Sequence, residues 1–407
     1  MLTRRSVLRA AGLTIGALGT VPGWLLRAAA QGHDTRKVLV VVFQRGAADG
    51  LNMVVPFFEK RYYDLRPTIA VPPPGAGNGG IDLDGRFALH PSLLPLKDLW
   101  DARALAIVHA AGSHDPTRSH FDAQDYMESG TPGVKAEDGW LNRSLPPTSG
   151  VASPMRAVAI GTEVPLTLRG TRGALAVDNV TTFQIGQPES VSTLEQLYAA
   201  TTDARLAAQG KGTFEAVRSI ESIRRRPYAP ANGAQYFGAF GRRLQQVARL
   251  IKADIGVEVA FADIGGWDHH SDETRQLTPL VREFGAALAA FARDMGDRME
   301  DIVLVTMSEF GRTTAENGNG GTDHGHGNVM FVMGGPVRGG SVYGTWPGLE
   351  REQLFEQRDL AVTRDFRDVL GELVQLHLGQ DTNHVFPNYR AGSSLGLLRG
   401  QRAAKTE

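Results

Sequence analysis

Two short segments of the chain gather acidic and imidazole side chains that could bind a divalent metal. The first is Gly265–His270 (GGWDHH), and the second carries Glu309, Asp323, His324 and His326 in a stretch rich in glycine and asparagine. Each segment follows an apolar run of the kind that forms a buried strand. Acidic and imidazole groups are costly to desolvate unless they are paired, and they are donors that divalent metals take in proteins. The two segments therefore indicate a metal-dependent hydrolase.

The overall composition and net charge exclude several classes of protein. The chain has 407 residues, of which 42% are hydrophobic and 21% are charged, which is enough for a large core. Its net charge of −1 provides no basic face, so we expect no nucleic-acid partner. The sequence contains no cysteine, which excludes thiolate catalysis, zinc fingers and disulfide bonds. Any metal must therefore be held by Asp, Glu, His, Ser or Asn.

Alternating apolar and amphipathic segments predict the elements that position these groups. Continuous apolar, β-branched runs are typical of strands buried on both faces of a parallel sheet. The predicted strands are 37–44, 105–111, 156–161, 257–264, 302–306 and 329–333. The predicted helices are 93–101, 120–130, 279–300 and 363–378, and two more at 194–226 and 236–252 form a helical insertion at about 190–255. This alternation predicts an α/β fold with a largely parallel sheet.

Polar residues directly follow most of the predicted strands. Asp49, Ser119, Asp268, Glu309 and His324 each come after an apolar run. In parallel sheets, the loops at the carboxyl ends of the strands converge and form the binding site. The sequence therefore predicts that these five residues surround one crevice.

The N-terminal segment, residues 1–30, has the pattern of an export signal. A twin-arginine sequence, TRRSVLR at Thr3–Arg9, precedes a modestly apolar stretch and Ala28–Ala30. The apolar stretch is interrupted by glycines and is too weakly apolar for a permanent membrane span. We expect export by the twin-arginine machinery, cleavage near Ala30, and a periplasmic or secreted domain at 31–407. A Sec signal or an uncleaved anchor is the alternative.

Six motifs of the chain carry a family resemblance. The sequences RGAADGLN, SHFDAQDYMESG, DGWLNR, GGWDHH, SEFGRT and TDHGHG resemble the bacterial family called domain of unknown function 1501, whose members are typically exported with a twin-arginine signal. The order of the motifs is also similar to the alkaline phosphatase superfamily, which includes the sulfatases. The resemblance covers roughly residues 36–390. It implies a three-layer alkaline phosphatase-like sandwich and one or two divalent ions, which could be Zn, Mn, Mg or Ca.

The resemblance also implies roles for individual residues. Ser119 matches the nucleophile that opens a helix, with His120 as its neighbour, and Arg118 is a candidate clamp for a tetrahedral oxyanion. Asp323 is either a direct ligand or the partner that fixes the tautomer of His324. The expected metal ligands are Asp49, Asp268, His270, Glu309, Asp323, His324 and His326.

Structural interpretations remain open for several of these residues. Asp49 and Ser119 could cap helices, and Glu309 could form a salt bridge with Arg312. The chain also departs from the superfamily pattern, because Ser308 and Glu309 replace an aspartate and a histidine. Arg118 likewise stands where an acid is usual.

Two functions follow as expectations. The first is an exported hydrolase of small phosphate or sulfate esters, in which Ser119 or a metal-bound water attacks. The alternative is an inactive periplasmic binding or scaffold protein that keeps the fold, with or without a structural metal. A phosphonate or phosphosugar mutase is a third, weaker alternative.

Overall fold

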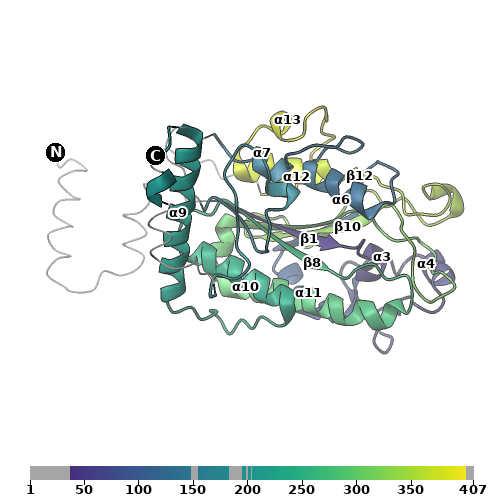
Figure 1. The fold of residues 1–407 in the computed structure, drawn as a ribbon. Helices are drawn as coiled ribbons and strands as arrows, with labels where there is room; N and C mark the ends of the chain where they lie inside the picture. The colour runs from purple at the N-terminus through teal and green to yellow at the C-terminus, as the bar shows by residue number, and fades with distance from the viewer. Residues whose placement is uncertain (1–36, 148–154, 183–194, 199, 203, 400–407) are drawn as a thin grey trace, which may run out of the picture. The chain divides into compact units, whose positions relative to one another are not determined.

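A mixed sheet with helices on both faces forms the centre of the molecule (Figure 1). The computed structural model describes residues 37–147, 155–182, 195–198, 200–202 and 204–399. In this part of the chain the sheet has nine strands in the order β11-β5-β10-β9-β1-β8-β6-β7, and β12 also pairs with β5. The strands are β1 (Val38–Arg45), β5 (Leu105–Gly112), β6 (Ala157–Ala159), β7 (Leu175–Ala176), β8 (Val259–Gly265), β9 (Ile302–Ser308), β10 (Asn328–Gly334), β11 (Ser341–Tyr343) and β12 (Arg364–Asp365).

Most neighbouring strands run parallel, as the sequence predicted. β1 pairs in parallel with β8 and with β9, so that Val41 lies opposite Phe261 on one side and Val305 on the other. β10 is the exception, because it runs antiparallel to both β9 and β5. The first residue of β10, Asn328, therefore lies at the edge where β1, β8 and β9 end. The loop that joins β9 to β10 stays at that edge.

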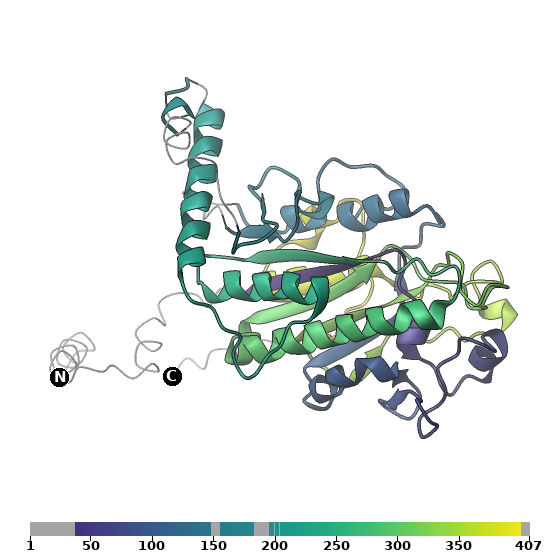
Figure 2. The same cartoon turned by 60° about the horizontal axis from the view of Figure 1, so that its bottom comes forward.

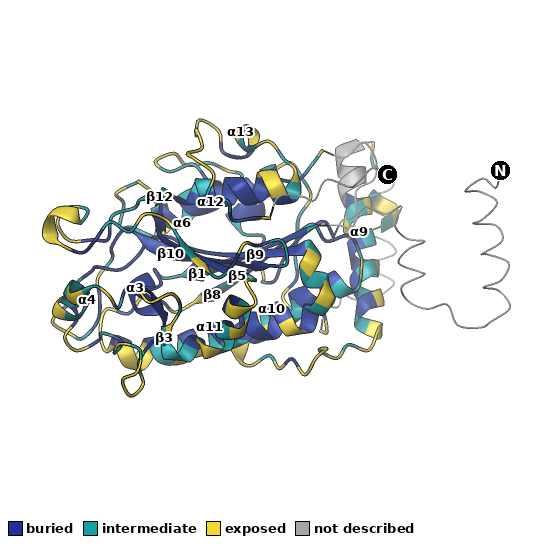
Figure 3. Cartoon of the chain, turned by 180° about the vertical axis from the view of Figure 1, so that it is seen from behind, coloured by how far each residue is buried: buried dark blue, intermediate teal, exposed yellow. Residues whose placement is uncertain are grey.

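The sheet separates two hydrophobic layers, and β1 contributes to both. Successive side chains of a strand point to opposite faces, so Val40 and Val42 pack in one cluster while Val41 and Phe43 pack in the other. All four side chains are fully buried, as the dark blue strands of Figure 3 illustrate. The first face is covered by η1 (Pro91–Leu96), α5 (Lys97–Asp101), α10 (Gly238–Lys252) and α11 (Glu273–Met295). The second is covered by α6 (His120–Ser129), α7 (Trp140–Arg143), α12 (Phe366–Leu373) and α13 (Thr382–Val385). The predicted three-layer α/β arrangement is confirmed.

The boundaries of α11 differ from the prediction. The helix begins at Glu273, and Pro279 lies inside it rather than at its start. Proline is favoured in the first turn of a helix, which is why the sequence suggested a later beginning. The earlier start is fixed by tertiary contacts: the Glu273 amide donates to the Gly320 carbonyl at 2.8 Å, and the Thr322 hydroxyl donates to its carboxylate at 2.7 Å.

The chain between β7 and β8 includes α9 (Ala204–Arg225) and α10. α10 packs against α11 and β8, whereas α9 extends beyond the sheet layer, as the second view shows (Figure 2). The described residues also form several short elements. They are α3 (Gly50–Met53), β2 (Val54–Val55), α4 (Lys60–Leu65), β3 (Ile81–Asp82), β4 (Ala88–Leu89), η2 (Leu166–Leu168), η3 (Gly296–Asp301) and η4 (Arg351–Gln353). Among the described helices, none has the length and apolar character needed to cross a membrane. The predicted twin-arginine segment and Ala30 lie outside the described residues.

Candidate metal centre

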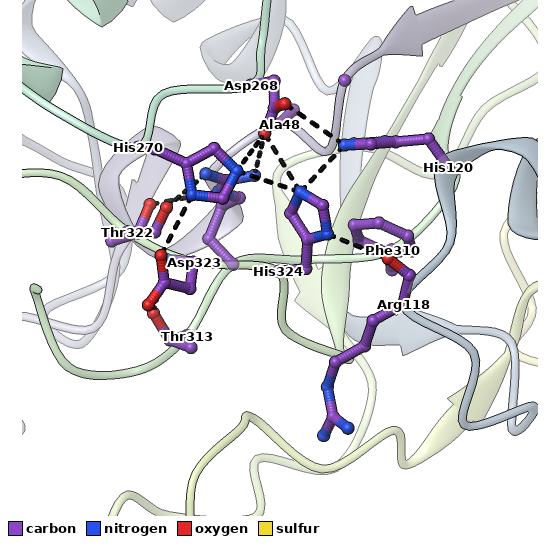
Figure 4. A network of polar contacts seen from close by, with 12 residues as sticks. Ala48, Arg118, His120, Asp268, His270, Phe310, Thr313, Thr322, Asp323 and His324 are labelled. Carbon is purple, nitrogen blue, oxygen red and sulfur yellow. Dashed lines mark hydrogen bonds and ion pairs between the residues drawn. The ribbon is translucent and has the colours of Figure 1, made fainter.

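Three histidines and one aspartate meet at the carboxyl edge of the sheet (Figure 4), and the ligand atoms of His120, Asp268 and His324 lie within 4.8 Å of one another. His120 opens α6, Asp268 and His270 follow β8, and His324 lies in the loop before β10. The Nε2 atom of His324 lies 3.0 Å from the Nε2 atoms of both His120 and His270. Oδ1 of Asp268 lies 3.2 Å from Nε2 of His324 and 2.9 Å from Nε2 of His270. We call these four residues the His/Asp cluster.

Each histidine of the cluster is oriented by an acceptor on its far side. An acceptor facing Nδ1 fixes the tautomer in which Nδ1 carries the proton, so that Nε2 presents a bare lone pair. The three acceptors come from different elements of the chain. The contacts are His120 Nδ1 with Glu309 Oε1 at 2.8 Å, His270 Nδ1 with Asp323 Oδ1 at 3.0 Å, and His324 Nδ1 with the Arg118 carbonyl oxygen at 2.8 Å.

This arrangement of tautomers fits a cation at the centre of the cluster. Burial lowers the pKa of His324, so this ring stays neutral with its bare Nε2 facing two other Nε2 atoms. A proton on Nε2 of His120 would turn its contact with His324 into a hydrogen bond. The contact between Nε2 of His270 and Nε2 of His324 would still have no donor. Three imidazole nitrogens and one carboxylate, without sulfur, are a donor set that Zn²⁺ accepts in a tetrahedral site. The residues present therefore fit a divalent metal.

Arg312 holds Asp268 in place. Its guanidinium is fully buried and donates from Nη1 to Oδ1 of Asp268 at 2.7 Å, while its Nε donates to the Thr322 hydroxyl at 3.1 Å. Burial alone raises the pKa of Asp268, but the hydrogen bond and charge of Arg312 outweigh it and hold the pKa below its usual value. Asp268 is therefore charged at neutral pH. The predicted alternative of a salt bridge between Glu309 and Arg312 is wrong, because Arg312 pairs with Asp268.

Glu309 supports His120 from a buried position. Its carboxylate is 1% exposed and accepts hydrogen bonds from the Gly46 amide at 2.8 Å and from Nε2 of Gln124 at 2.9 Å. Burial alone raises the pKa of Glu309, but the hydrogen bonds from His120, from Gln124 and from backbone amides together outweigh burial and keep the pKa below its ordinary value. The hydrogen bond between His120 and Glu309 raises the pKa of His120. A charged carboxylate behind the ring increases the basicity of its Nε2.

Gly46 lets the loop after β1 approach the cluster. Its φ is +115°, and a Cβ at this position would lie 2.9 Å from the backbone nitrogens of both Trp267 and Asp268. Only glycine tolerates both the backbone conformation and this contact. Because of this close approach, the Gly46 amide donates a hydrogen bond to Glu309, and the loop after β8 that contains Asp268 lies directly beside Gly46.

The structure brings together only part of the predicted ligand set. Asp268, His270 and His324 meet as predicted, whereas His120, predicted as a catalytic neighbour of Ser119, joins them through Nε2. Asp323 lies behind His270, not behind His324.

Asp49 is not among the converging ligands, and this corrects the prediction. Both of its carboxylate oxygens face the buried guanidinium of Arg66, at 2.5 and 3.1 Å, and Oδ1 also accepts from the Leu51 amide and caps α3. Burial alone raises the pKa of Asp49, but the charge and hydrogen bonds of Arg66, together with a hydrogen bond to Glu273 and the charge of Arg312, outweigh burial and lower the pKa. Burial and the neighbouring charge of Asp49 raise the pKa of Glu273, so this second carboxyl group is protonated.

Two other predicted residues make structural contacts. Ser119 is the N-cap of α6, and its hydroxyl accepts from the Asp122 amide at 3.4 Å. Arg118 is not a free anion clamp, because its guanidinium pairs with Asp359 at 2.6 Å and Glu356 at 2.7 Å.

His326 also lies outside the cluster. Its ring is buried and stacks on Phe355 with centroids 4.0 Å apart, and burial lowers its pKa to about 4. His324 and His326 are two residues apart, so in an extended segment both side chains would face the same side, and both were predicted as ligands of one site. His324 forms an isolated antiparallel bridge with Arg312, and the backbone bends at His326, so the segment is not one extended strand.

Sequence reasoning missed two supporting contacts. Gln124 stands four residues after His120 and therefore on the same face of α6, which was a usable signal. The carbonyl group of Arg118 that orients His324 gives no signal, because every residue carries one.

Comparisons with known proteins add a family and two distant structural relatives. The family model described as Protein of unknown function (DUF1501) matches residues 106–385, which include the whole His/Asp cluster. The chain is similar to the C-terminal periplasmic domain of EcEptC from Escherichia coli, in complex with Zn, at 9% identity and a TM-score of 0.35, over 75% of this chain and 74% of that one. It is similar to alkaline phosphatase from the Antarctic bacterium TAB5 at 10% identity and a TM-score of 0.32, over 74% of this chain and 92% of that one. No curated protein matches the chain.

Proposed function

We propose that this chain, which belongs to the DUF1501 family of proteins of unknown function, is an exported metal-dependent hydrolase of phosphate or sulfate esters with water as the nucleophile. The observation that supports this is the convergence of three Nε2 atoms, each on a ring whose Nδ1 faces an acceptor. Histidines that bind metals in proteins are commonly oriented in this way. The twin-arginine pattern at Thr3–Arg9 supports export.

The bound cation and the residues around it would have different roles in hydrolysis. A divalent cation bound there would supply Lewis-acid chemistry, polarising an ester oxygen and lowering the pKa of water. Asp268, His270 and Asp323 are 43%, 45% and 55% exposed, so substrate and water reach the cluster directly from solvent. Ser119 is engaged as a helix cap, which favours water over this hydroxyl as the nucleophile.

Metal content and turnover of the mature chain test this proposal. We expect the wild-type protein to bind one divalent ion per chain and to hydrolyse at least one ester in a panel of phosphate and sulfate esters. His324→Ala should lose the ion and lower turnover by a factor on the order of 100 or more, because it removes the nitrogen shared by the other contacts. His384→Ala is the matched control, since His384 is exposed on α13. Retention of the ion by His324→Ala, or absence of any bound ion in the wild type, would show the proposal to be wrong.

The ion pairs of the two nearby arginines favour a second function. Arg118 and Arg312 are both committed to carboxylates, so neither is free to neutralise an anionic substrate. A protein that binds the metal without turnover would have this property. Tight metal binding by the wild type, with no turnover on any ester of the panel, would identify it as a binding or scaffold protein.

A further inference from the structure

A cleft of about 720 Å³ lies at the same edge of the sheet as the His/Asp cluster. Its walls come from the ends of β1, β6 and β8 and from one side of α6. The side chains used below are Arg45, Asp125, Glu128, Glu137, Arg243 and Asp263. None of these residues belongs to the cluster.

Helix α6 connects the cleft with the metal centre. His120, Gln124 and Glu128 stand four residues apart and therefore lie on one face of this helix. At 1.5 Å per residue, His120 and Glu128 are about 12 Å apart along the helix axis. Nη1 of Arg45 lies 2.9 Å from Oε1 of Gln124 and 2.9 Å from Oε1 of Glu128. Gln124 in turn donates to Glu309, so hydrogen bonds run without a break from the cleft to the centre.

Arg45 presents hydrogen-bond donors to the cleft. Its Nε donates to Asp263 at 2.9 Å and its Nη1 is held as described, whereas its Nη2 meets no acceptor in the described part of the chain. The side chain is 24% exposed and stacks over Phe43 with its guanidinium carbon 4.6 Å from the ring centroid. The guanidinium is thus fixed, with two N–H groups available to a ligand. Arg243 adds a second guanidinium, also paired with Asp263.

Carboxylates on the other walls present acceptors. Asp125 on α6 and Glu137 in the following loop line the cleft, and the described residues offer no ion-pair partner to either. Charged acceptors therefore face the same space as the two N–H groups of Arg45.

We propose that this cleft binds a neutral, hydroxyl-rich group, that is, a carbohydrate. A hydroxyl group both donates and accepts hydrogen bonds, so it can satisfy Asp125 and Arg45 together. An anionic group would face unpaired carboxylates, and an ammonium group could not accept from Arg45. Resting on the proposed function, the substrate of the centre is then a phosphate or sulfate ester of a sugar long enough to span about 12 Å.

Sugar binding to the full mature chain tests this inference without relying on turnover. Nuclear magnetic resonance titrations with glucose, galactose, N-acetylglucosamine and their disaccharides would be compared with glucosamine and glucuronate as charged counterparts. Asp125→Ala and Arg45→Lys should each weaken binding of the neutral sugars about tenfold, because each removes a direct hydrogen bond. Asp297→Ala is the matched control, since Asp297 is exposed on η3 and does not line the cleft.

Each outcome of the titrations decides the matter. Neutral sugars that bind the wild type and Asp297→Ala, and bind both cleft variants more weakly, support the inference. Absence of neutral-sugar binding, equal binding by Asp125→Ala, or binding of only glucosamine or only glucuronate overturns it. The same titration on His324→Ala separates the two proposals, because sugar binding should persist after the metal is lost. Failure of ester hydrolysis with intact sugar binding would remove the proposed function alone.

Discussion

At the scale of single residues, the three histidines of the centre differ in how firmly they are held. His120 is backed by the buried, charged carboxylate of Glu309, whereas His270 is backed by the half-exposed Asp323. Water competes with Asp323 for hydrogen bonds but cannot reach Glu309. We therefore expect Glu309 to contribute more to metal affinity than Asp323 does.

Replacing Glu309 with glutamine tests this expectation. The change keeps the volume but removes the negative charge that raises the basicity of His120. Metal affinity should fall between about 10-fold and 100-fold, measured by competition with a chromophoric chelator. Glu300→Gln, an exposed position on η3, should leave the affinity unchanged. An unaltered affinity in Glu309→Gln would mean that His120 is not a ligand.

The residue types near the centre were readable from the sequence, but their pairing was not. GGWDHH and the loop around His324 identified three members of the cluster because acids and imidazoles rarely follow buried strands without a reason. Asp49 satisfied the same rule, yet it pairs with Arg66. The burial of Arg66 depends on tertiary packing, since its Nε and Nη2 donate to the carbonyl groups of Thr314 and Thr313. No local pattern around Arg66 predicts this.

At the scale of elements, the six predicted strands are present, whereas the short strands β2, β3, β4, β7, β11 and β12 were not predicted and strand directions were predicted only in part. A continuous apolar run indicates a strand that is buried on both faces, whether its neighbours run parallel or antiparallel. The antiparallel direction of β10 could therefore not be predicted from its sequence. Helix α6 was expected to end at Gly130, and it does, because Gly130 adopts a left-handed conformation with φ of +72°.

The start of α6 supplies a prediction that separates a helix cap from a nucleophile. Ser119→Ala removes the acceptor of the Asp122 amide and should lower the free energy of unfolding by about 1 kcal/mol. Turnover of an ester substrate should stay within about threefold of the wild type, because water and not this hydroxyl attacks in the proposed function. Ser119→Asp, which keeps the cap, should retain the stability of the wild type. Loss of turnover by Ser119→Ala in a folded, metal-loaded protein would make Ser119 the nucleophile after all.

At the scale of the whole molecule, buried neutral histidines set the response to acid. His109 and His377 are buried, their Nε2 atoms lie 3.0 Å from the Val54 and Val38 carbonyl oxygens, and burial lowers the pKa of each to about 4. An unfolded histidine has a pKa of about 6.5. Between these values the unfolded chain binds more protons than the folded chain, so stability falls as the pH drops.

Chemical unfolding between pH 7 and pH 4 measures this effect. We expect each of the two histidines to lower the free energy of unfolding by roughly 3 kcal/mol at pH 4 relative to pH 7. His109→Gln should make the decline shallower, whereas His384→Gln, at an exposed position, should not change it. Equal slopes for His109→Gln and the wild type would show that His109 already carries a proton in the native protein.

The open position of the His/Asp cluster has a consequence for how the proposed metal ion would reach it. Within the described part of the chain, no segment has to move before a dissolved cation can touch Asp268 or His270, since nearly half of each side chain already faces solvent. Exchange should then be limited by the strength of the bonds to the ion and not by any motion of the fold. The identity of the bound ion would depend on which divalent ions are present in the surrounding solution. A chelator should remove the ion from the folded protein without denaturing it.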